Sequence, residues 1–164
     1  MDQFDVDLLN LVQLDNRLTA AQLSEKIGLS PSACQRRLRH LRDKGVIEHD
    51  ISVVAPEKVG QHMTMIVEVS LEREQPDLID QFKRSMIKRP EVMQCYYVTG
   101  DADFILIVTA KNMQDYEAFS RRCFQDNLNI RQFKTNVVMD RVKTSFFVPV
   151  EEAAGWALNG SDPC

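Results

Sequence analysis

The stretch GLSPSACQRRLRHLRDKGVI, from Gly28 to Ile47, carries five basic residues and one acidic residue in a chain whose formal net charge is -4. Ser30 followed by Pro31 predicts the start of a helix, because serine caps free backbone N–H groups and proline fits the first helical position. At 100° per residue, the apolar residues of this helix share one side and most of the basic residues share the other. The apolar side is formed by Cys34, Leu38, Leu41 and Gly45. The stretch therefore predicts a helix with a buried inner side and a basic outer side.

Two further helices are expected before this one. The spacing of apolar residues from Asp5 to Val12 predicts a first helix that ends near Asp15. Thr19, with Gln22 three residues later, is a capping box that starts a second helix, and Gly28 suits its left-handed C-terminal cap. Two helices joined by a tight glycine-containing turn, the second with a basic face, are typical of the helix-turn-helix, which places its second helix in the DNA major groove.

This placement predicts which side chains contact double-stranded DNA. Ser32 and Ala33 are small enough to allow close approach to base edges, while Gln35 and Arg36 reach acceptors in the groove. Phosphate contacts are expected from Arg37, Arg39, Arg42 and Lys44, and backbone contacts from the helix starts at Thr19 and Ser30. A charged helix face is also compatible with plain solvated surface. Such faces normally mix both signs of charge, however, and this one is almost entirely basic.

The second half of the chain has a different pattern. From Met63 apolar and polar residues alternate, which predicts a strand. Strands are expected at 63–71, 92–98, 104–110 and 130–139, and helices at 76–88 and 113–128. Two β-α-β halves in tandem predict an α+β fold with a ferredoxin-like βαββαβ domain, in which both helices cover one face of an antiparallel sheet.

The sequence therefore predicts two domains. A helix-turn-helix DNA-binding domain spans 1–50, a linker 51–62, the ferredoxin-like domain 63–150 and a tail 151–164. Val46–Val54 is expected to form a short hairpin or strand, which would be the wing of a winged helix-turn-helix. Lys143–Val150 is expected to add a fifth strand, on this sheet or on a partner chain.

Composition excludes several classes of protein. At 164 residues, 44% hydrophobic and 27% charged, the chain is expected to be folded, and no apolar run reaches the roughly 18 residues that cross a membrane. Its acidic start lacks the basic region of a secretory signal, which favours a cytoplasmic protein. The four cysteines and three histidines have no metal-binding spacing, and no nucleophile with a base or phosphate-binding loop is present. We expect no enzyme activity, no metal and no cofactor.

Several motifs together resemble the leucine-responsive/asparagine-responsive (Lrp/AsnC) family of bacterial and archaeal transcription regulators. The first half contributes Asp5 with Leu8-Leu9, Asp15-Asn16-Arg17-Leu18-Thr19, Leu23-Ser24, Gly28-Leu29-Ser30-Pro31, Arg37 and Gly45-Val46-Ile47. The second half contributes Val98-Thr99-Gly100-Asp101-Ala102-Asp103-Phe104, Val137-Val138-Met139 and Val142-Lys143. The resemblance covers residues 2–150. The chain departs from the family at Asn16, where glycine is usual, in its short N-terminus and in its tail.

The resemblance implies a role for the second domain as well. In this family it pairs through its sheets into homodimers, which also assemble in fours into octamers, and it binds an amino-acid effector between subunits. Effector contacts are then expected from the loop formed by Gly100, Asp101, Ala102 and Asp103, and from Val98, Asn136 and Val138. The same loop is also compatible with a plain hairpin turn, because Gly and Asp are favoured there for backbone reasons alone.

Two functions remain open from the sequence. The first is a DNA-binding transcription regulator whose operator affinity or assembly responds to an amino acid. The second is a metabolite-binding regulatory subunit that partners an enzyme and uses its basic helix for protein contact.

Overall fold

The computed structural model describes residues 1–151, and their contacts divide the chain into two compact units. Unit 1 comprises Met1–Ser52 together with the described residues from Lys143 onward, and unit 2 comprises Val53–Val142. Residues 143–150, expected to belong to the ferredoxin-like domain, fall in unit 1 by these contacts. Apart from Glu151, the expected tail lies outside the described residues.

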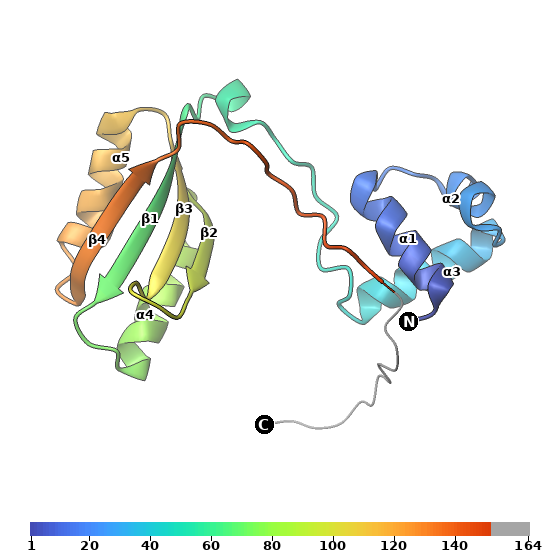
Figure 1. Cartoon of the computed structure of the whole chain (residues 1–164), viewed down its shortest axis with the longest axis horizontal. Helices are drawn as coiled ribbons and strands as arrows, with labels where there is room; N and C mark the ends of the chain where they lie inside the picture. Colours follow the sequence, from blue (N-terminus) through green and yellow to red (C-terminus); the bar gives the residue numbers. More distant parts are fainter. Residues whose placement is uncertain (152–164) are drawn as a thin grey trace. The chain divides into compact units, whose positions relative to one another are not determined.

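Unit 1 contains three helices, which are α1 (Gln3–Leu14), α2 (Ala20–Ile27) and α3 (Pro31–Asp43) (Figure 1). Each begins at a side chain that accepts a backbone N–H of the first turn: Asp2 for α1, Thr19 for α2 and Ser30 for α3. Gly28 ends α2 with φ +78°, a left-handed conformation that favours glycine. The predicted caps at Thr19, Gly28 and Ser30 are confirmed.

The three helices enclose a small apolar core. Its buried members are Leu8, Leu9, Leu23, Cys34, Leu38 and Leu41. Ile47 and Val150 pack against this cluster from outside the helices, so both sequence segments of unit 1 contribute to its core.

The expected hairpin or strand at Val46–Val54 does not form. The backbone N–H groups of Val46 and Ile47 both donate to the Leu41 carbonyl, at 2.9 and 3.2 Å, which fixes a turn after α3. Beyond it the chain is extended without strand pairing up to a 3-10 turn at Pro56–Val59. A strand needs a neighbour for its backbone groups, and none of the described residues provides one here.

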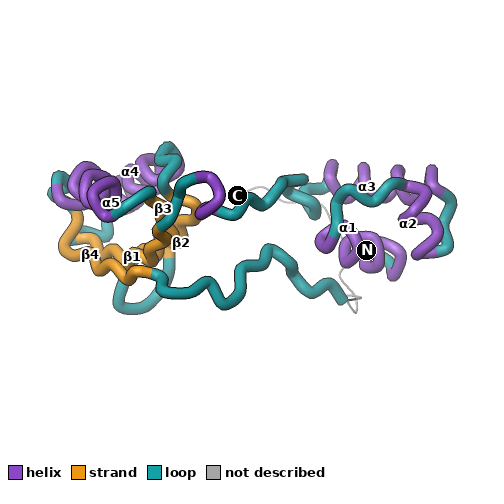
Figure 2. Tube along the Cα trace, turned by 90° about the horizontal axis from the view of Figure 1, so that it is seen from above, coloured by secondary structure: helices purple, strands orange, loops and turns teal. Residues whose placement is uncertain are grey.

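Unit 2 is a four-stranded antiparallel sheet with two helices. Its elements are β1 (Met63–Leu71), α4 (Pro76–Ile87), β2 (Val92–Tyr97), β3 (Phe104–Ala110), α5 (Met113–Ser120) and β4 (Ile130–Val137). The strand order is β2-β3-β1-β4 with every pairing antiparallel, which confirms the ferredoxin-like prediction. Figure 2 shows α4 and α5 on the same side of the sheet.

Alternation along the strands separates a covered face from an open one. Met65, Val67 and Val69 of β1 are fully buried and face the helices, where they pack with Phe104 and Phe119. The intervening Ile66 is 37% exposed, on the face that no helix of unit 2 covers among the described residues. In this register Ile66 pairs with Ile107, and Ile105 pairs with Tyr96. The open face therefore presents apolar side chains at its centre.

Two further expectations need correction. α5 continues only through a π-helical turn at Arg121–Gln125, so the helix expected at 113–128 stops earlier. Asn127 ends it, because its side chain accepts the Asn129 N–H in a tight turn and leaves Leu128 exposed.

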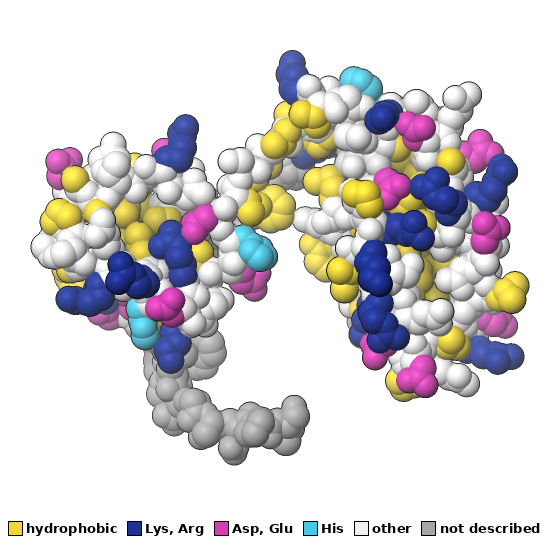
Figure 3. Space-filling model, turned by 180° about the vertical axis from the view of Figure 1, so that it is seen from behind, with side chains coloured by type: hydrophobic (Ala, Val, Ile, Leu, Met, Phe, Trp, Pro, Cys, Tyr) yellow, Lys and Arg dark blue, Asp and Glu magenta, His cyan; other side chains and the backbone are white. Residues whose placement is uncertain are grey.

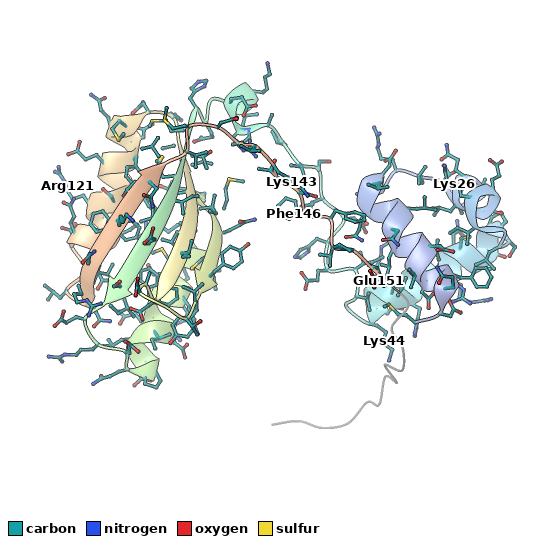
Figure 4. All side chains as sticks on the ribbon, viewed as in Figure 1. Lys26, Lys44, Arg121, Lys143, Phe146 and Glu151 are labelled. Atoms are coloured by element: carbon teal, nitrogen blue, oxygen red, sulfur yellow. The ribbon has the colours of Figure 1, made fainter. Side chains whose placement is uncertain are left out.

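Lys143–Val150 adds no strand to the sheet and instead runs along α1. The Gln13 amide donates to the Val148 carbonyl at 3.0 Å and accepts the Val148 N–H at 2.7 Å. The Asn10 amide donates to the Val150 carbonyl at 3.2 Å. We call residues 143–151 the C-terminal strap; Lys143, Phe146 and Glu151 mark it in Figure 4.

Within the described part of the chain, no helix has the length and apolar character of a membrane span.

Candidate functional site

The outward face of α3 presents the side chains expected to read DNA. Ser32, Gln35, Arg36 and Arg39 are all exposed on it, and Ala33 is half-buried at its edge. The salt bridges within described unit 1 engage other arginines, so Arg36 and Arg39 have no acidic partner there. Figure 3 shows Lys and Arg side chains on the visible face of this unit, with Asp, Glu and His side chains among them.

Arg37 is placed differently from this face. Its Nη1 lies 2.8 Å from Asp5 Oδ1 and its Nη2 lies 2.8 Å from Asp2 Oδ2, and its side chain is 28% exposed. The guanidinium carbon also lies 5.5 Å from the centre of the Phe4 ring, within cation–π range. The hydrogen bond to Asp5 raises the pKa of Arg37 against the effect of burial. The structure thus turns this expected phosphate contact towards α1.

Arg42 is also paired, but on the exposed surface. Its Nε donates to Asp50 Oδ2 at 2.8 Å and its Nη2 to Asp50 Oδ1 at 3.2 Å, a bidentate contact. The hydrogen bond from Arg42 lowers the pKa of Asp50 below its ordinary value of 3.8. Because the two side chains are 40% and 45% exposed, a phosphate can compete for this guanidinium.

The remaining expected DNA contacts lie at helix ends. Thr19 Oγ1 accepts the Gln22 N–H at 3.2 Å, and Ser30 Oγ accepts the Ala33 N–H at 3.3 Å. Both hydroxyls therefore cap their helices, and both residues are exposed. Lys44 follows the last turn of α3 and is exposed (Figure 4).

An open hollow of about 340 Å³ lies beside the outward face of α3. It is lined by Asp5, Arg36, Arg37 and His40. Arg36 lines the hollow without an acidic partner among the described residues, whereas Arg37 lines it together with its partner Asp5.

In unit 2, the loop from Val98 to Asp103 is held by backbone contacts. The Val98 N–H donates to the Asp103 carbonyl at 2.9 Å, and the Asp103 N–H donates to the Val69 carbonyl at 3.0 Å. Asp103 Oδ2 accepts the Leu71 N–H at 2.7 Å. Gly100 has φ +128°, a conformation that favours glycine. The Asp103 carboxylate therefore fastens the loop to the end of β1.

The other members of the expected effector site lie elsewhere on the sheet. Asn136 pairs with Ile66, and the Val138 N–H donates to the Thr64 carbonyl at 2.9 Å. Thr64 and Val69 are five residues apart, which at about 3.3 Å per residue is roughly 17 Å along β1. The Asn136 amide also donates to Glu68 Oε1 at 3.0 Å. Within one chain, the structure does not bring these two residues to the Gly100 loop.

Residue reasoning from the sequence missed the acidic partners of the arginines. Asp2 and Asp5 form a capping box at the start of α1, a signal that the D-x-x-D spacing carries. Nothing in the local sequence indicates that Arg37, 32 residues beyond Asp5, would reach this box. Asp50 was missed because the turn after α3 brings it back to Arg42.

Family models match both halves of the chain. A model described as winged helix-turn-helix DNA-binding matches residues 1–48, and one described as the Lrp/AsnC ligand binding domain matches residues 64–146. Together they cover both units of the structure.

Individual proteins match over most of their length. An uncharacterized HTH-type transcriptional regulator of Sinorhizobium fredii is 62% identical over 92% of this chain and 89% of its own. The leucine-responsive regulatory protein of Escherichia coli is 31% identical over 88% of each chain. Among solved structures, a transcriptional regulator of Neisseria meningitidis in complex with L-Met has a TM-score of 0.85 at 30% identity, covering 91% of this chain and 96% of that one.

Proposed function

The chain belongs to the Lrp/AsnC family of transcription regulators, and from this premise we propose that it reads an operator by placing α3 in the DNA major groove. The observation that carries this proposal is the outward face of α3, where Arg36 and Arg39 are exposed without acidic partners among the described residues. Asp2, the N-cap of α1, and Asp5, in its first turn, both pair with Arg37 on the flank of α3. The outward face thus keeps its positive charge for an anionic partner.

The contacts divide into reading and positioning. Ser32, Ala33, Gln35 and Arg36 lie in the first half of α3 and meet base edges, while Arg39, Arg42 and Lys44 meet phosphates. Thr19 and Ser30 lie at the N-termini of α2 and α3, and these helix ends place their partial positive charge against the DNA phosphate backbone. An operator on the chromosome puts the protein's site of action in the cytoplasm.

Arg36→Ala and Arg42→Ala test this division. Arg36→Ala is expected to change base preference, whereas Arg42→Ala is expected to weaken binding to all duplexes alike. Arg84→Ala, an exposed arginine on α4, is the matched control for the loss of one positive charge. Titrations use a duplex that the wild-type protein selects from a random-sequence library and a scrambled duplex. Equal losses on both duplexes for Arg36→Ala would refute its base-reading role.

Salt dependence separates the regulator from the alternative regulatory subunit. Phosphate contacts release counterions, so the DNA affinity of a regulator falls steeply as salt rises. Absence of sequence-selective retention at moderate salt would favour a subunit that partners an enzyme.

We also propose that the open face of unit 2 binds a second copy of the chain. Ile66, Ile105, Ile107 and Tyr96 form its apolar centre, and a homodimer would place two copies of α3 about one helical turn apart on DNA. Ile107→Lys is expected to produce monomers in light scattering. Ile87→Lys, on an apolar side chain that is 82% exposed at the end of α4, is the control and should leave the assembly unchanged. Further assembly of dimers in fours would give an octamer.

The effector proposed for unit 2 is an amino acid. The complex of the similar Neisseria meningitidis regulator with L-Met supports this class of ligand. A ligand between subunits would meet the loop of one chain, with Val98, Gly100, Asp101, Ala102 and Asp103, and Asn136 and Val138 of another. Such a site changes operator affinity only if the ligand binds the DNA-competent assembly and its alternative with different affinities.

A thermal-shift screen of the twenty amino acids tests the effector class. The wild-type protein is expected to be stabilised by one or a few of them, because a ligand that binds the folded state raises its stability. Asp101→Ala removes an exposed loop carboxylate and is expected to abolish that response. An unchanged stabilisation profile in the variant would dismiss Asp101 as a contact.

A further inference from the structure

Arg37 makes more contacts within the protein than any other arginine of α3 in the described structure. Its two terminal nitrogens bind two carboxylates, those of Asp2 and Asp5, with distances of 2.8 to 3.0 Å. The Phe4 ring lies against its guanidinium. Asp2, Phe4 and Asp5 all belong to the start of α1, so one side chain ties that helix end to the middle of α3.

The two carboxylates are also held by hydrogen bonds within α1. Asp2 Oδ1 accepts the Asp5 N–H at 3.0 Å, and Asp5 Oδ2 accepts the Asp2 N–H at 3.2 Å. Each acid thus uses one oxygen in the capping box of α1. Asp5 offers its other oxygen to Arg37, and Asp2 offers both of its oxygens. The positive end of the α1 dipole holds the same pair of charges in place. Arg37 therefore binds a preformed receptor, with planar geometry that a lysine cannot reproduce.

A DNA phosphate is a poor competitor for this guanidinium. To contact Arg37 it would approach two carboxylates, and like charges at such range repel. Arg36 and Arg39 lie beside Arg37 in sequence, and both are exposed without such acids among the described residues.

We propose that Arg37 is a positioning residue, which sets the orientation of α3 relative to α1 through Asp2 and Asp5 and makes no contact with DNA. The inference rests on the proposed function only in that α3 is the helix that enters the groove. Arg37 is thus not one of the phosphate contacts. It holds in place the outward face of α3, on which Ser32 and Arg36 lie.

The salt dependence of DNA binding distinguishes the two roles. Arg37→Gln and Arg39→Gln are compared in the full-length protein, on the duplex selected by the wild type, over a range of salt concentrations. Loss of a phosphate contact lowers the slope of log affinity against log salt by about 0.9. Arg37→Gln is expected to keep the wild-type slope and to lose at least about five-fold in affinity for the selected duplex, the low end for one lost base-pair contact. A slope reduced like that of Arg39→Gln would overturn the proposal, and so would wild-type affinity.

Neutralising the two acids gives the sharper result. Asp2→Asn with Asp5→Asn removes two negative charges next to the DNA face, which on electrostatic grounds alone strengthens binding. The positioning role predicts the opposite, a loss of affinity for the selected duplex. Tighter binding of that duplex by the double variant would overturn the proposal.

Arg37→Lys distinguishes a loss of positioning from a loss of folding. It keeps the charge, and its folding is checked by circular dichroism at the temperature of the titrations. The positioning role predicts that lysine at this position does not restore affinity, because an ammonium cannot bridge both carboxylates as the planar guanidinium does. Full restoration by lysine would overturn it.

The failure of the proposed function is distinguishable from the failure of this inference. If the wild type itself shows no selective, salt-dependent binding, both fail. A reduced slope in Arg37→Gln overturns the inference alone.

Discussion

Asp103 holds the loop after β2 through a single charged hydrogen bond to the backbone. Its carboxylate accepts the Leu71 N–H at 2.7 Å, at the end of β1. A hydrogen bond with one charged partner contributes about 1.5 to 3 kcal/mol, and its loss leaves a half-buried donor without a partner. The same carboxylate is an expected ligand of the effector ammonium, so the two roles compete for it.

Asp103→Ala is expected to lower the free energy of unfolding by about 1.5 to 3 kcal/mol, because the Leu71 N–H loses its acceptor. Urea denaturation of the variant without ligand measures this. Asp101→Ala, in the same loop but exposed, is the control and should change stability by less than about 0.5 kcal/mol. Unfolding midpoints that agree between Asp103→Ala and the wild type would remove the structural role of Asp103.

Acid weakens the contact between Arg42 and Asp50. The hydrogen bond from Arg42 lowers the pKa of Asp50, so this carboxylate adds stability above its unfolded pKa near 3.8 and loses it as pH falls through the lower folded value. Because the pair is exposed, its effect is expected to be below about 1 kcal/mol. The difference in stability between wild type and Asp50→Asn should therefore be present at about pH 6 and shrink as pH falls below the unfolded pKa of 3.8. A difference that grows towards low pH would contradict this sign.

Helix ends are the elements that the sequence specified best. The caps at Thr19, Gly28 and Ser30 depend on side chains within three residues of the helix they begin or end, so local sequence determines them. The alternation that predicted the strand from Met63 is equally local. The fold class and the outward face of α3 were predictable for this reason.

The segments that were misjudged depend on distant partners. Val46–Val54 has the composition of a strand, but the described chain offers it no neighbouring strand. Lys143–Val150 has a similar composition, yet the amides of Gln13 and Asn10, 135 and 140 residues before their partners, hold it as the strap. Within one chain, the strand order separates the Gly100 loop from Asn136. The effector site, expected between subunits, therefore stays a prediction.

The tight turn between α2 and α3 depends on one backbone conformation. Gly28 has φ +78° and open space where a Cβ would lie, so a substitution there meets conformational strain and no clash. Gly28→Ala is expected to cost about 1 to 2 kcal/mol, and Gly28→Asn less, because asparagine tolerates the left-handed region. Thermal unfolding of the two variants measures this. Melting temperatures of both variants equal to that of the wild type would show that the turn does not depend on glycine at this position.

At the scale of the whole molecule, the chain passes between its two units twice. It leaves unit 1 after Ser52 and returns to it at Lys143. The returning strap is held through backbone groups of Val148 and Val150, with Val150 packed on the core of the three helices.

Gln13→Ala is expected to lower the stability of unit 1, because each of its two hydrogen bonds to Val148 contributes about 0.5 to 1.5 kcal/mol. Hydrogen exchange of the α1 amides measures the change in this unit separately from unit 2. Gln3→Ala is the matched control, since Gln3 lies on the same helix and its side chain bonds to the Asp7 side chain, at 2.8 Å, and not to the strap. A chain ending at Val142 should show a larger loss than Gln13→Ala. Protection of α1 that is identical in all four proteins would exclude a stabilising role for the strap.

Because the strap is held on α1, a single cut in the chain between the two units is expected to leave the two fragments associated. If a protease cut the segment between Ser52 and Met63, the helical fragment would still hold the far end of the other fragment through the amides of α1 and the side chain of Val150. The two fragments are then expected to co-purify. When they are expressed separately and mixed, they are expected to form a complex. A cut in that segment alone would therefore not separate the helices of unit 1 from unit 2.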